Sequence, residues 1–392
     1  MKNDFDHINS ETSLYTNKIF DVGIAGGGLA GLSLSILCNK AGYNSIVIEK
    51  EKYPFHKVCG EYISFESWDF LEELGIPLSE MNLPVIRKLL VSAPNGKFLE
   101  HSLPLGGFGI SRYKLDALLA SVAEKRGALI LENTKALNIH FTDDLFSIQF
   151  SGNNVRCKTA IGAFGKRSAI DVHWKRKFIR QNKGRLQNYI GVKYHIKMDW
   201  PDELIALHNF KNGYCGISKI EDKKCCLCYL TTANNLNRCG NDIKRMEQEI
   251  LQQNPFLKKI FLESSFLFEN PVTIAQISFA AKTQVENHVL LTGDAAGMIA
   301  PLCGNGMSMA LHSSRILFPV IRSFLQGKIN RKQMEMEYQK QWKKIFSKRL
   351  TTGRTIQRFF GSPLLSNIMI SCLKPFPGIL NKLISSTHGK PF

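Results

Sequence analysis

The segment Ile19–Gly31, with the sequence IFDVGIAGGGLAG, decides the fold of this chain. Its apolar part, Ile19 to Ala25, predicts a buried parallel strand, and a glycine cluster follows at once. The next residues, Leu29 to Asn39, predict a helix. G-x-G-x-x-G spacing between strand and helix is typical of a loop that binds a dinucleotide, and three glycines supply it here: Gly26, Gly28 and Gly31.

Each glycine of this loop has a physical role. Gly26 permits the tight turn from strand to helix, and Gly28 lets backbone N–H groups approach a pyrophosphate. Gly31 allows the helix to pack closely on the strand. The first residues of the helix, Leu29 and Ala30, lie at its positive end, where unpaired N–H groups favour a diphosphate.

A second predicted strand, Ser45–Ile48, ends in Glu49, which stands 18 residues beyond Gly31. An acidic residue at this place typically accepts hydrogen bonds from an adenosine ribose, and Lys50 follows it. A merely structural glycine turn is the alternative. Because the strand, the helix, the second strand and the carboxylate occur in order, we expect a dinucleotide site.

The length and the cysteine content restrict the class of protein. A chain of 392 residues is long enough for two packed units. No stretch approaches the roughly 20 apolar residues of a membrane-spanning helix, and the first 18 residues lack the apolar core of a signal peptide. Ten cysteines in such a chain favour reduced thiols and a cytoplasmic location. Cys225, Cys226 and Cys228 alternate along one predicted strand, so we expect buried small side chains and no metal site.

The formal net charge of +18 is unusual and is concentrated in two segments. Lys166–Arg185 holds eight Lys and Arg residues against one Asp, and Lys328–Arg358 holds ten against two Glu. A solvated basic face, an anionic membrane surface and a nucleic acid are the possible explanations. The chain contains no recognisable nucleic-acid module, so we expect no nucleic-acid partner.

A second stretch with chemical character begins after the short apolar run Val289–Leu291. It contains Gly293 and Asp294, then the sequence PLCGNGM from Pro301 to Met307, and then a predicted helix to Leu325 that Pro319 is expected to bend. Small residues and an acid after a strand suit close approach of the backbone to a ligand.

Three separated stretches resemble the FAD-binding segments of flavoprotein oxidoreductases that include aromatic hydroxylases and geranylgeranyl reductases. The glycine loop with Glu49 resembles the adenine-end fingerprint. Arg112, followed by Leu115 and Asp116, is similar to the family arginine that contacts the cofactor. Gly293 and Asp294 resemble the motif whose Asp binds the ribityl or diphosphate part of FAD. The loop under the flavin pyrimidine ring would contain Pro301, Gly304, Asn305, Gly306 and Met307.

Within this superfamily, Val58–Glu61 and Pro301–Gly306 look closest to the geranylgeranyl-reductase-like branch. Aromatic hydroxylases usually carry an Asp-Gly pair after the strand that returns to the parallel sheet. Phe164 stands here where the acid is expected. This departure weakens the hydroxylase interpretation and leaves the electron donor open, with NADPH or NADH as candidates.

The resemblance implies an α/β (overall α+β) fold with a Rossmann-like FAD-binding domain, an antiparallel β-sheet substrate domain and a C-terminal helical cap. We expect residues 1–17 to form a flexible lead-in. Residues 18–75, 110–168 and 280–330 would form the FAD domain, and residues 76–109 and 169–279 the substrate domain. Residues 331–392 would form the helical region.

The expected activity is hydride transfer from reduced flavin to a carbon–carbon double bond of a lipophilic, isoprenoid-like substrate. A monooxygenase acting on an aromatic or polyketide-like metabolite and a non-catalytic flavin-binding protein are the alternatives. Cys59, which could donate a proton or shape the pocket, and Glu61, a possible acid, are the candidate catalytic residues. The basic and apolar C-terminal region would either cover the second domain or touch an anionic membrane from the inner face. The sequence leaves the oligomeric state open.

Overall fold

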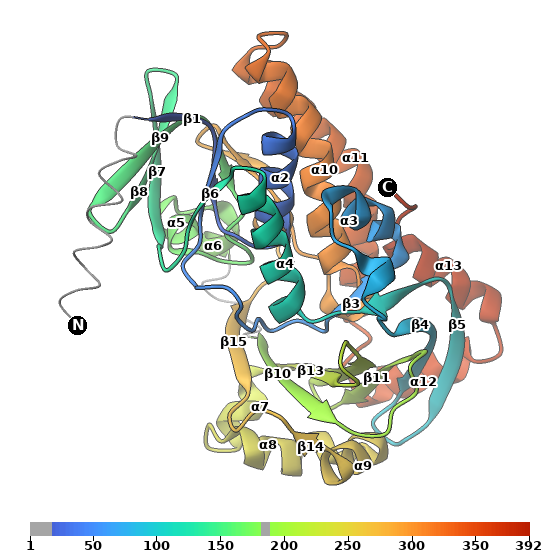
Figure 1. The fold of residues 1–392 in the computed structure, drawn as a ribbon. Coiled ribbons are helices and arrows are strands. Elements are labelled where there is room, and N and C mark those ends of the chain that lie inside the picture. Colours follow the sequence, from blue (N-terminus) through green and yellow to red (C-terminus); the bar gives the residue numbers. More distant parts are fainter. Residues whose placement is uncertain (1–17, 182–188) are drawn as a thin grey trace.

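The structure, a computed structural model, describes residues 18–181 and 189–392. The expected N-terminal lead-in, residues 1–17, lies outside the described residues. Two β-sheets form two lobes, and helices from both ends of the chain cover them (Figure 1).

The first sheet is built around the predicted strand β1 (Ile19–Ala25). The order of its main path is β16-β17-β9-β1-β2-β6. The four pairings among β17, β9, β1, β2 and β6 are parallel, as the buried apolar run predicted. β7 and β8 add an antiparallel hairpin beside β9. The bounds are β2 (Ser45–Ile48), β6 (Leu129–Leu131), β7 (Ala136–Thr142), β8 (Leu145–Phe150), β9 (Asn153–Gly162), β16 (Val285–Glu286) and β17 (Val289–Leu291).

Helices connect and cover these parallel strands, because parallel neighbours need crossover connections. The predicted helix after the glycine loop is confirmed as α2 (Leu29–Lys40), and it packs on α10 (Gly306–Leu325). A hydrogen bond of 2.6 Å between the hydroxyls of Ser33 and Ser314 joins the two. α11 (Arg331–Gln357) runs beside α10 (Figure 1), and α3 (Trp68–Leu74) and α4 (Arg112–Lys125) lie near α2.

The second sheet has the order β14-β10-β13-β12-β11-β4-β5-β3, and β15 also pairs with β10. Its pairings are antiparallel except that of β11 with β4, which is parallel. The sheet is therefore mixed, because the β4–β5 hairpin comes from an earlier part of the chain and joins the meander by a long connection. The bounds are β3 (Tyr62–Ser64), β4 (Val85–Ser92), β5 (Phe98–Gly109), β10 (Tyr189–Lys197), β11 (Leu204–Phe210), β12 (Gly213–Lys219), β13 (Cys225–Thr232), β14 (Ser265–Phe266) and β15 (Val272–Ile277).

Two segments lie in a different lobe from the one we expected. β3 belongs to the second sheet, where it pairs with β5, although residues 18–75 were assigned to the first lobe. α5 (Ala169–His173) contacts β7 of the first sheet, although residues 169–279 were assigned to the second. The buried ion pair of Arg176 with Asp171, 2.6 Å, anchors this segment, and the Arg176 side chain also donates to the carbonyl of Ala295.

The C-terminal helices cover the second sheet, as a helical cap would. α12 (Pro363–Leu373) contacts β11, and α13 (Pro377–Thr387) contacts β5. The final residues return to the first lobe, where the Phe392 N–H donates to the Glu66 carbonyl and its ring stacks on His312 at 4.0 Å. α6 (Lys177–Gln181), α7 (Ala233–Arg238), α8 (Ile243–Glu249) and α9 (Pro255–Glu263) complete the described helices.

No single described helix is long and apolar enough to cross a membrane. Together, α12 and α13 have the length and apolar composition of a membrane-spanning helix, but the chain bends by 117° at the break between them.

Candidate functional site

The glycine loop has the geometry that the sequence predicts. Gly26 has a φ of +111°, and a Cβ at this position would lie 2.4 Å from the carbonyl oxygen of Ala163. A Cβ on Gly31 would lie 2.1 Å from the carbonyl oxygen of Gly26. A Cβ on Gly28 meets only the tips of two side chains, Arg112 Nη2 at 3.7 Å and Lys57 Nζ at 3.9 Å. Gly26 and Gly31 are therefore required by the fold, whereas Gly28 faces space lined by two cations.

An ion network fixes these two cations. Asp116 accepts two hydrogen bonds from Arg112, at 2.6 and 2.7 Å, and one from Lys57 at 2.9 Å. Burial alone would raise the pKa of Asp116, but the charges of Arg112 and Lys57 outweigh it and lower the pKa. Two positive charges face one negative charge, so the network leaves one positive charge beside the N-terminus of α2. An anionic diphosphate fits this place.

Glu49 is buried at the end of β2 and supports the glycine loop directly. Its carboxylate accepts the Gly27 N–H at 2.8 Å and the Glu51 N–H at 3.2 Å. The Tyr53 hydroxyl donates to the Gly27 carbonyl from the other side. Lys50 differs, because its side chain is exposed and pairs with Glu51 at 3.1 Å. The structure therefore gathers Glu49 into the site but shows no contact of Lys50 with the loop.

The segment with Gly293 and Asp294 lies close to Arg112, which also lies beside the glycine loop. Gly293 and Asp294 follow β17, and the Gly293 N–H donates to Ser313 of α10 at 3.0 Å. Burial raises the pKa of Asp294, while the charges of Lys282 and Arg112 oppose the rise. Arg112 is thus close enough to act on Asp294 and also lies beside Gly28. A Cβ on Gly293 would lie 3.2 Å from the Ala30 Cβ at the start of α2, so the three stretches that the sequence singled out lie beside one another.

The loop before α10 leaves polar atoms without partners. Pro301–Cys303 forms a 3₁₀ turn, and Gly304, with a φ of +65°, lies against Tyr62. The Asn305 amide donates to the Thr387 carbonyl at 2.9 Å, but its Oδ1 and the hydroxyl of Ser308 are buried with no hydrogen-bond partner among residues 18–181 and 189–392. Buried polar groups normally have partners, so these atoms beside the N-terminus of α10 fit a polar ligand edge. Gly306 and Met307 begin that helix.

Glu61 is the centre of a buried cluster. It has no exposed surface, and its carboxylate accepts the Arg112 N–H at 2.8 Å, His195 Nε2 at 2.6 Å and Lys193 Nζ. Burial alone would raise the pKa of Glu61, but the hydrogen bond of His195 and the charge of Lys193 outweigh it and lower the pKa. Glu61 is therefore held as a carboxylate, which does not suit the role of acid considered for it. The Cys226 thiol lies close enough to complete a possible three-residue metal-ligand group with Glu61 and His195, but Lys193 already neutralises the carboxylate.

Cys59 precedes this cluster by two residues. Burial raises the pKa of its thiol, even though the Arg112 charge opposes the rise. The thiol therefore keeps its proton at neutral pH. The carbonyl oxygen of Cys59 lies 3.2 Å from the Cys226 sulfur, which ties the Cys59 turn to β13 of the second sheet.

The strand register of the second sheet places this cluster on the same face as an apolar surface. Side chains directly opposite each other on paired strands share a face. One cross-strand row runs through five residues from β4 to β10: Val91, Leu207, Gly216, Cys228 and Lys193. The face is apolar at the β4 end and charged at the β10 end.

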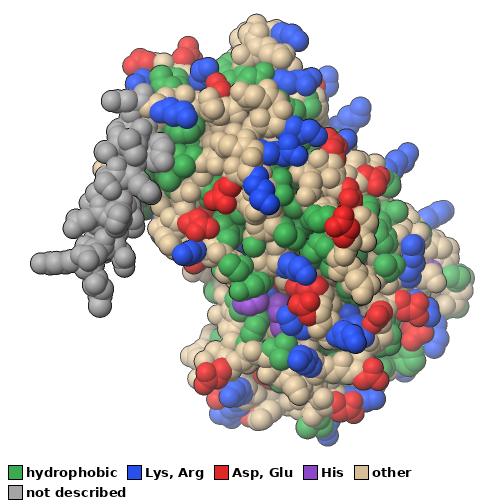
Figure 2. All heavy atoms as spheres, in the orientation of Figure 1, with side chains coloured by type: hydrophobic (Ala, Val, Ile, Leu, Met, Phe, Trp, Pro, Cys, Tyr) green, Lys and Arg blue, Asp and Glu red, His purple; other side chains and the backbone are tan. Residues whose placement is uncertain are grey.

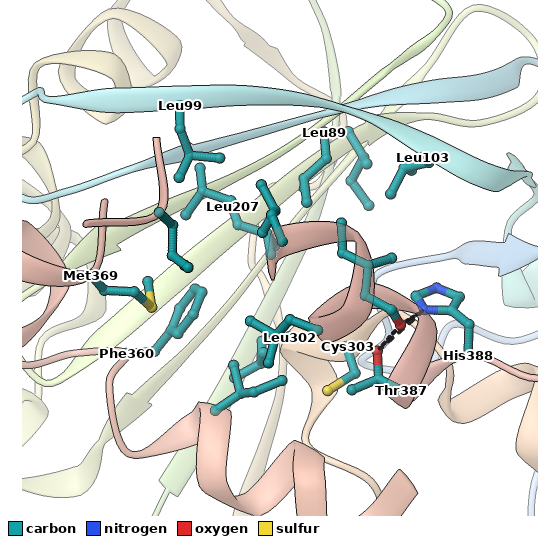
Figure 3. A pocket seen from close by; sticks show the side chains of 18 of the residues that line it. Leu89, Leu99, Leu103, Leu207, Leu302, Cys303, Phe360, Met369, Thr387 and His388 are labelled. Atoms are coloured by element: carbon teal, nitrogen blue, oxygen red, sulfur yellow. Dashed lines mark hydrogen bonds between the residues drawn. The ribbon is translucent and has the colours of Figure 1, made fainter. Parts of the chain in front are cut away.

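An apolar cavity lies over the β4 end of this face (Figure 3). Its volume is about 770 Å³, including the space at its open mouth. Figure 3 shows Leu89, Leu99 and Leu103 pointing from the sheet toward Leu302 and Cys303 of the loop before α10, with Phe360 and Met369 at one side. Gly304 and Tyr62 also line the cavity, so it reaches the loop expected under the flavin.

The sequence matches the FAD binding domain family over residues 20–348. The chain belongs to this family. The residues where these stretches meet fit the cofactor, because the cation pair beside Gly28 suits a diphosphate and the buried polar atoms before α10 suit a polar ring edge. This FAD-binding protein is accordingly an FAD-dependent oxidoreductase of the superfamily that the three motifs indicate.

Relatives and solved structures agree on the fold. The digeranylgeranylglycerophospholipid reductase of Methanocaldococcus jannaschii is 25% identical over 342 residues, which are 83% of this chain and 83% of that protein. Conditioned medium factor receptor 1 of Dictyostelium discoideum is 23% identical over 383 residues, 87% of this chain and 71% of that protein. The crystal structure of a geranylgeranyl bacteriochlorophyll reductase-like protein from Thermoplasma acidophilum has a TM-score of 0.77 at 19% identity, covering 96% of this chain and 97% of that one.

Proposed function

We propose that this flavoprotein reduces a carbon–carbon double bond of a lipophilic, isoprenoid-like substrate. The observation that carries the proposal is the apolar cavity, which begins among Leu89, Leu99 and Leu103 and ends at Gly304. A linear hydrocarbon chain fits a cavity with this lining, because its burial removes apolar surface from water. The reductase of Methanocaldococcus jannaschii acts, by its name, on such a lipid.

Bound FAD, once reduced by NADPH or NADH, would supply a hydride to the double bond. The protein residues would position the chain and exclude water. Leu207 and Val91 hold the chain against the sheet, and Gly216 leaves room for it to approach the polar end of the row. The row ends at Lys193, which is buried and paired with Glu61, so the apolar path ends before it.

We assign the proton for the second carbon to the Cys59 thiol. The thiol gives its proton to the carbon next to the one that receives the hydride, and the resulting thiolate is reprotonated from solvent. Burial keeps the thiol protonated at neutral pH. Glu61 acts as a positioning residue, because its carboxylate holds Lys193 and the Arg112 N–H in place.

Replacement of Cys59 tests this assignment. Cys59→Ala is expected to lower the rate of double-bond reduction by about 10²-fold, the lower range for loss of a general acid. Flavin content should be unchanged, because the turn that carries Cys59 is tied to Cys226 of β13 in the second sheet. The rate is measured in a single turnover, by following the oxidation of the reduced flavin after substrate is added. A Cys59→Ala protein that reduces the substrate at the wild-type rate would show that Cys59 does not donate the proton.

The reaction class can be tested by product mass. Reduced protein is incubated without air with a glycerolipid that carries unsaturated prenyl chains, and the lipid is analysed by mass spectrometry. Gain of two hydrogen atoms is expected. In air, a product that gains one oxygen atom and no hydrogen pair would instead establish the monooxygenase alternative. Flavin that stays reduced with every lipid and aromatic compound tested would favour a non-catalytic flavin-binding protein.

Gly216→Leu is expected to raise KM for the lipid about tenfold or more, because the new side chain narrows the path along the sheet. A Cβ at Gly216 meets Leu207 at 3.5 Å, an ordinary contact, and the backbone has no positive φ there. Gly216→Ala is the matched control and should change KM much less. An unchanged KM in Gly216→Leu, with the protein folded and loaded with flavin, would place the substrate elsewhere.

A further inference from the structure

The C-terminal part of the chain carries charge of one sign only. From Tyr338 to Phe392 the sequence contains ten Lys and Arg residues and no Asp or Glu. The exposed members in this range include Lys374 and Lys382, which lie at the end of α12 and in α13. Lys and Arg side chains also protrude along the upper right edge in Figure 2, where Figure 1 draws α11. A surface of this kind attracts an anionic partner.

The same helices expose large apolar side chains. On α12, Leu364 is 69% exposed and Ile368 is 50% exposed. Phe376, just before α13, and Ile379 within it are 56% and 55% exposed. Single exposed apolar residues are common, but a group on two consecutive helices with basic neighbours indicates an interaction site.

The inner faces of these helices line the apolar cavity. Met369 and Leu373 of α12, together with Leu380 and Ile384 of α13, face the cavity over the second sheet. The two helices are therefore apolar on both sides, with the cavity on one side and solvent on the other. Such helices form a thin cover between the cavity and whatever binds outside.

We propose that α12 and α13 form a membrane-docking hairpin that lies in the surface of an anionic bilayer and opens the cavity to it. The 117° bend between the helices suits a position within the interface, because a continuous span would need a straight path. Leu364, Ile368, Phe376 and Ile379 enter the acyl boundary, and Lys374 and Lys382 bind the anionic head groups.

The side chains favour a bilayer over a nucleic acid. Aliphatic residues such as Leu364 and Ile368 make no specific contact with phosphates or bases, but they gain by burial among acyl chains. The cavity behind the hairpin adds a second reason, since a lipid chain could pass from the bilayer into it without crossing water. The opening of the cavity to the bilayer rests on the proposed function, whereas binding of the outer face of the two helices to the bilayer does not, so vesicle binding tests the docking alone.

Vesicle co-sedimentation of the full-length protein with bound FAD tests the docking hairpin. Wild-type protein is expected to bind vesicles that contain phosphatidylglycerol and to bind phosphatidylcholine vesicles at least tenfold more weakly. The triple variant Leu364→Ser, Ile368→Ser and Ile379→Ser should lose at least tenfold in affinity for the anionic vesicles. Leu262→Ser is the matched control, because Leu262 on α9 is 70% exposed but lies outside the hairpin.

The contribution of the basic side chains to vesicle binding is tested by a separate variant with its own control. Lys374→Glu with Lys382→Glu should weaken binding about as much as the triple variant, whereas Lys258→Glu on α9 should leave it unchanged. Flavin content and melting temperature show that each variant is folded. The proposal would be overturned if the wild-type protein did not bind anionic vesicles, or if the triple variant bound them as tightly as the wild type. Binding to a DNA duplex that the triple substitution leaves intact, without vesicle binding, would assign the basic surface to nucleic acid instead.

Discussion

Replacing Gly28 with valine is expected to abolish retention of FAD while the protein stays folded. A side chain at Gly28 meets no protein atom closer than the flexible ends of Arg112 and Lys57, at 3.7 and 3.9 Å, so the fold accommodates it. The same side chain would occupy the space where the diphosphate must lie between the α2 N-terminus and these cations. The change removes a binding site without removing the structure around it.

The absorbance spectrum of purified Gly28→Val should show no band of oxidised flavin, even after reconstitution with FAD. Circular dichroism should show the secondary structure of the wild-type apoprotein. Gly31→Val is the informative contrast, because its Cβ would lie 2.1 Å from the Gly26 carbonyl oxygen and should prevent folding. A Gly28→Val protein with full flavin content would show that the glycine loop does not bind the cofactor.

Replacing Glu61 with glutamine is expected to cost about 3–5 kcal/mol of unfolding free energy, the usual result of leaving a buried charge without its partner. The Lys193 side chain has no exposed surface, and Glu61 is its only charged partner among the described residues. The double variant Glu61→Gln with Lys193→Met should recover most of the loss, because it removes both charges together. Urea denaturation of the wild type, Glu61→Gln, Lys193→Met and the double variant measures the coupling between the two residues.

The ion pair of Glu61 and Lys193 also predicts how the unfolding free energy depends on pH. The pKa of Glu61 is lowered in the folded protein, so its contribution is present above its unfolded pKa and is lost as pH falls through the folded value. The pKa of Lys193 is raised, because the Glu61 charge outweighs the effect of burial, so its contribution is lost as pH rises through the folded value. The difference in unfolding free energy between the wild type and the double variant should not change with pH between the unfolded pKa of Glu61 and the unfolded pKa of Lys193. A Glu61→Gln protein as stable as the wild type would mean that the pair is not formed.

The parts of the site that lie near one another in the sequence could be predicted, and those that meet only through the fold could not. The glycine loop, its strand and its helix depend on local periodicity and spacing, which the sequence displays directly. Arg112 and Asp294 were found only because motif resemblance linked them to the loop. Their proximity, which lets the Arg112 charge oppose the raised pKa of Asp294, comes from the fold and not from any local pattern.

Lys193 and His195 escaped prediction for a physical reason. Both lie in β10, in the run YIGVKYHIK, where Lys193, His195 and Lys197 look like the solvent face of an ordinary strand. Only the long-range contact with Glu61, more than 130 positions earlier, makes them a buried cluster. Lys193 and His195 alternate with Val192, Tyr194 and Ile196, which is the pattern of a half-exposed strand, so no local signal marked them as buried.

The parallel pairing of β11 with β4 was equally hidden, since hairpin signals specify only neighbours in the chain. Asn305 illustrates the same limit at the level of one side chain. Its place before α10 follows from the Gly-Asn-Gly turn, but its amide donates to Thr387 near the end of the chain. No local pattern specifies such a contact.

The single face that carries Val91, Leu207, Gly216, Cys228 and Lys193 has a consequence for divergence among relatives. Its apolar end is covered by the C-terminal helices, while its charged end is built by β10, β13 and Glu61, so the two ends come from different parts of the chain. Under the proposed function, the apolar end would set the length of hydrocarbon accepted, and it can be altered without changing the buried charged cluster. A chimera that exchanges only the residues after Phe360 should change the preference for chain length while leaving the Glu61–Lys193 pair intact, which would make this scaffold separable into two exchangeable modules.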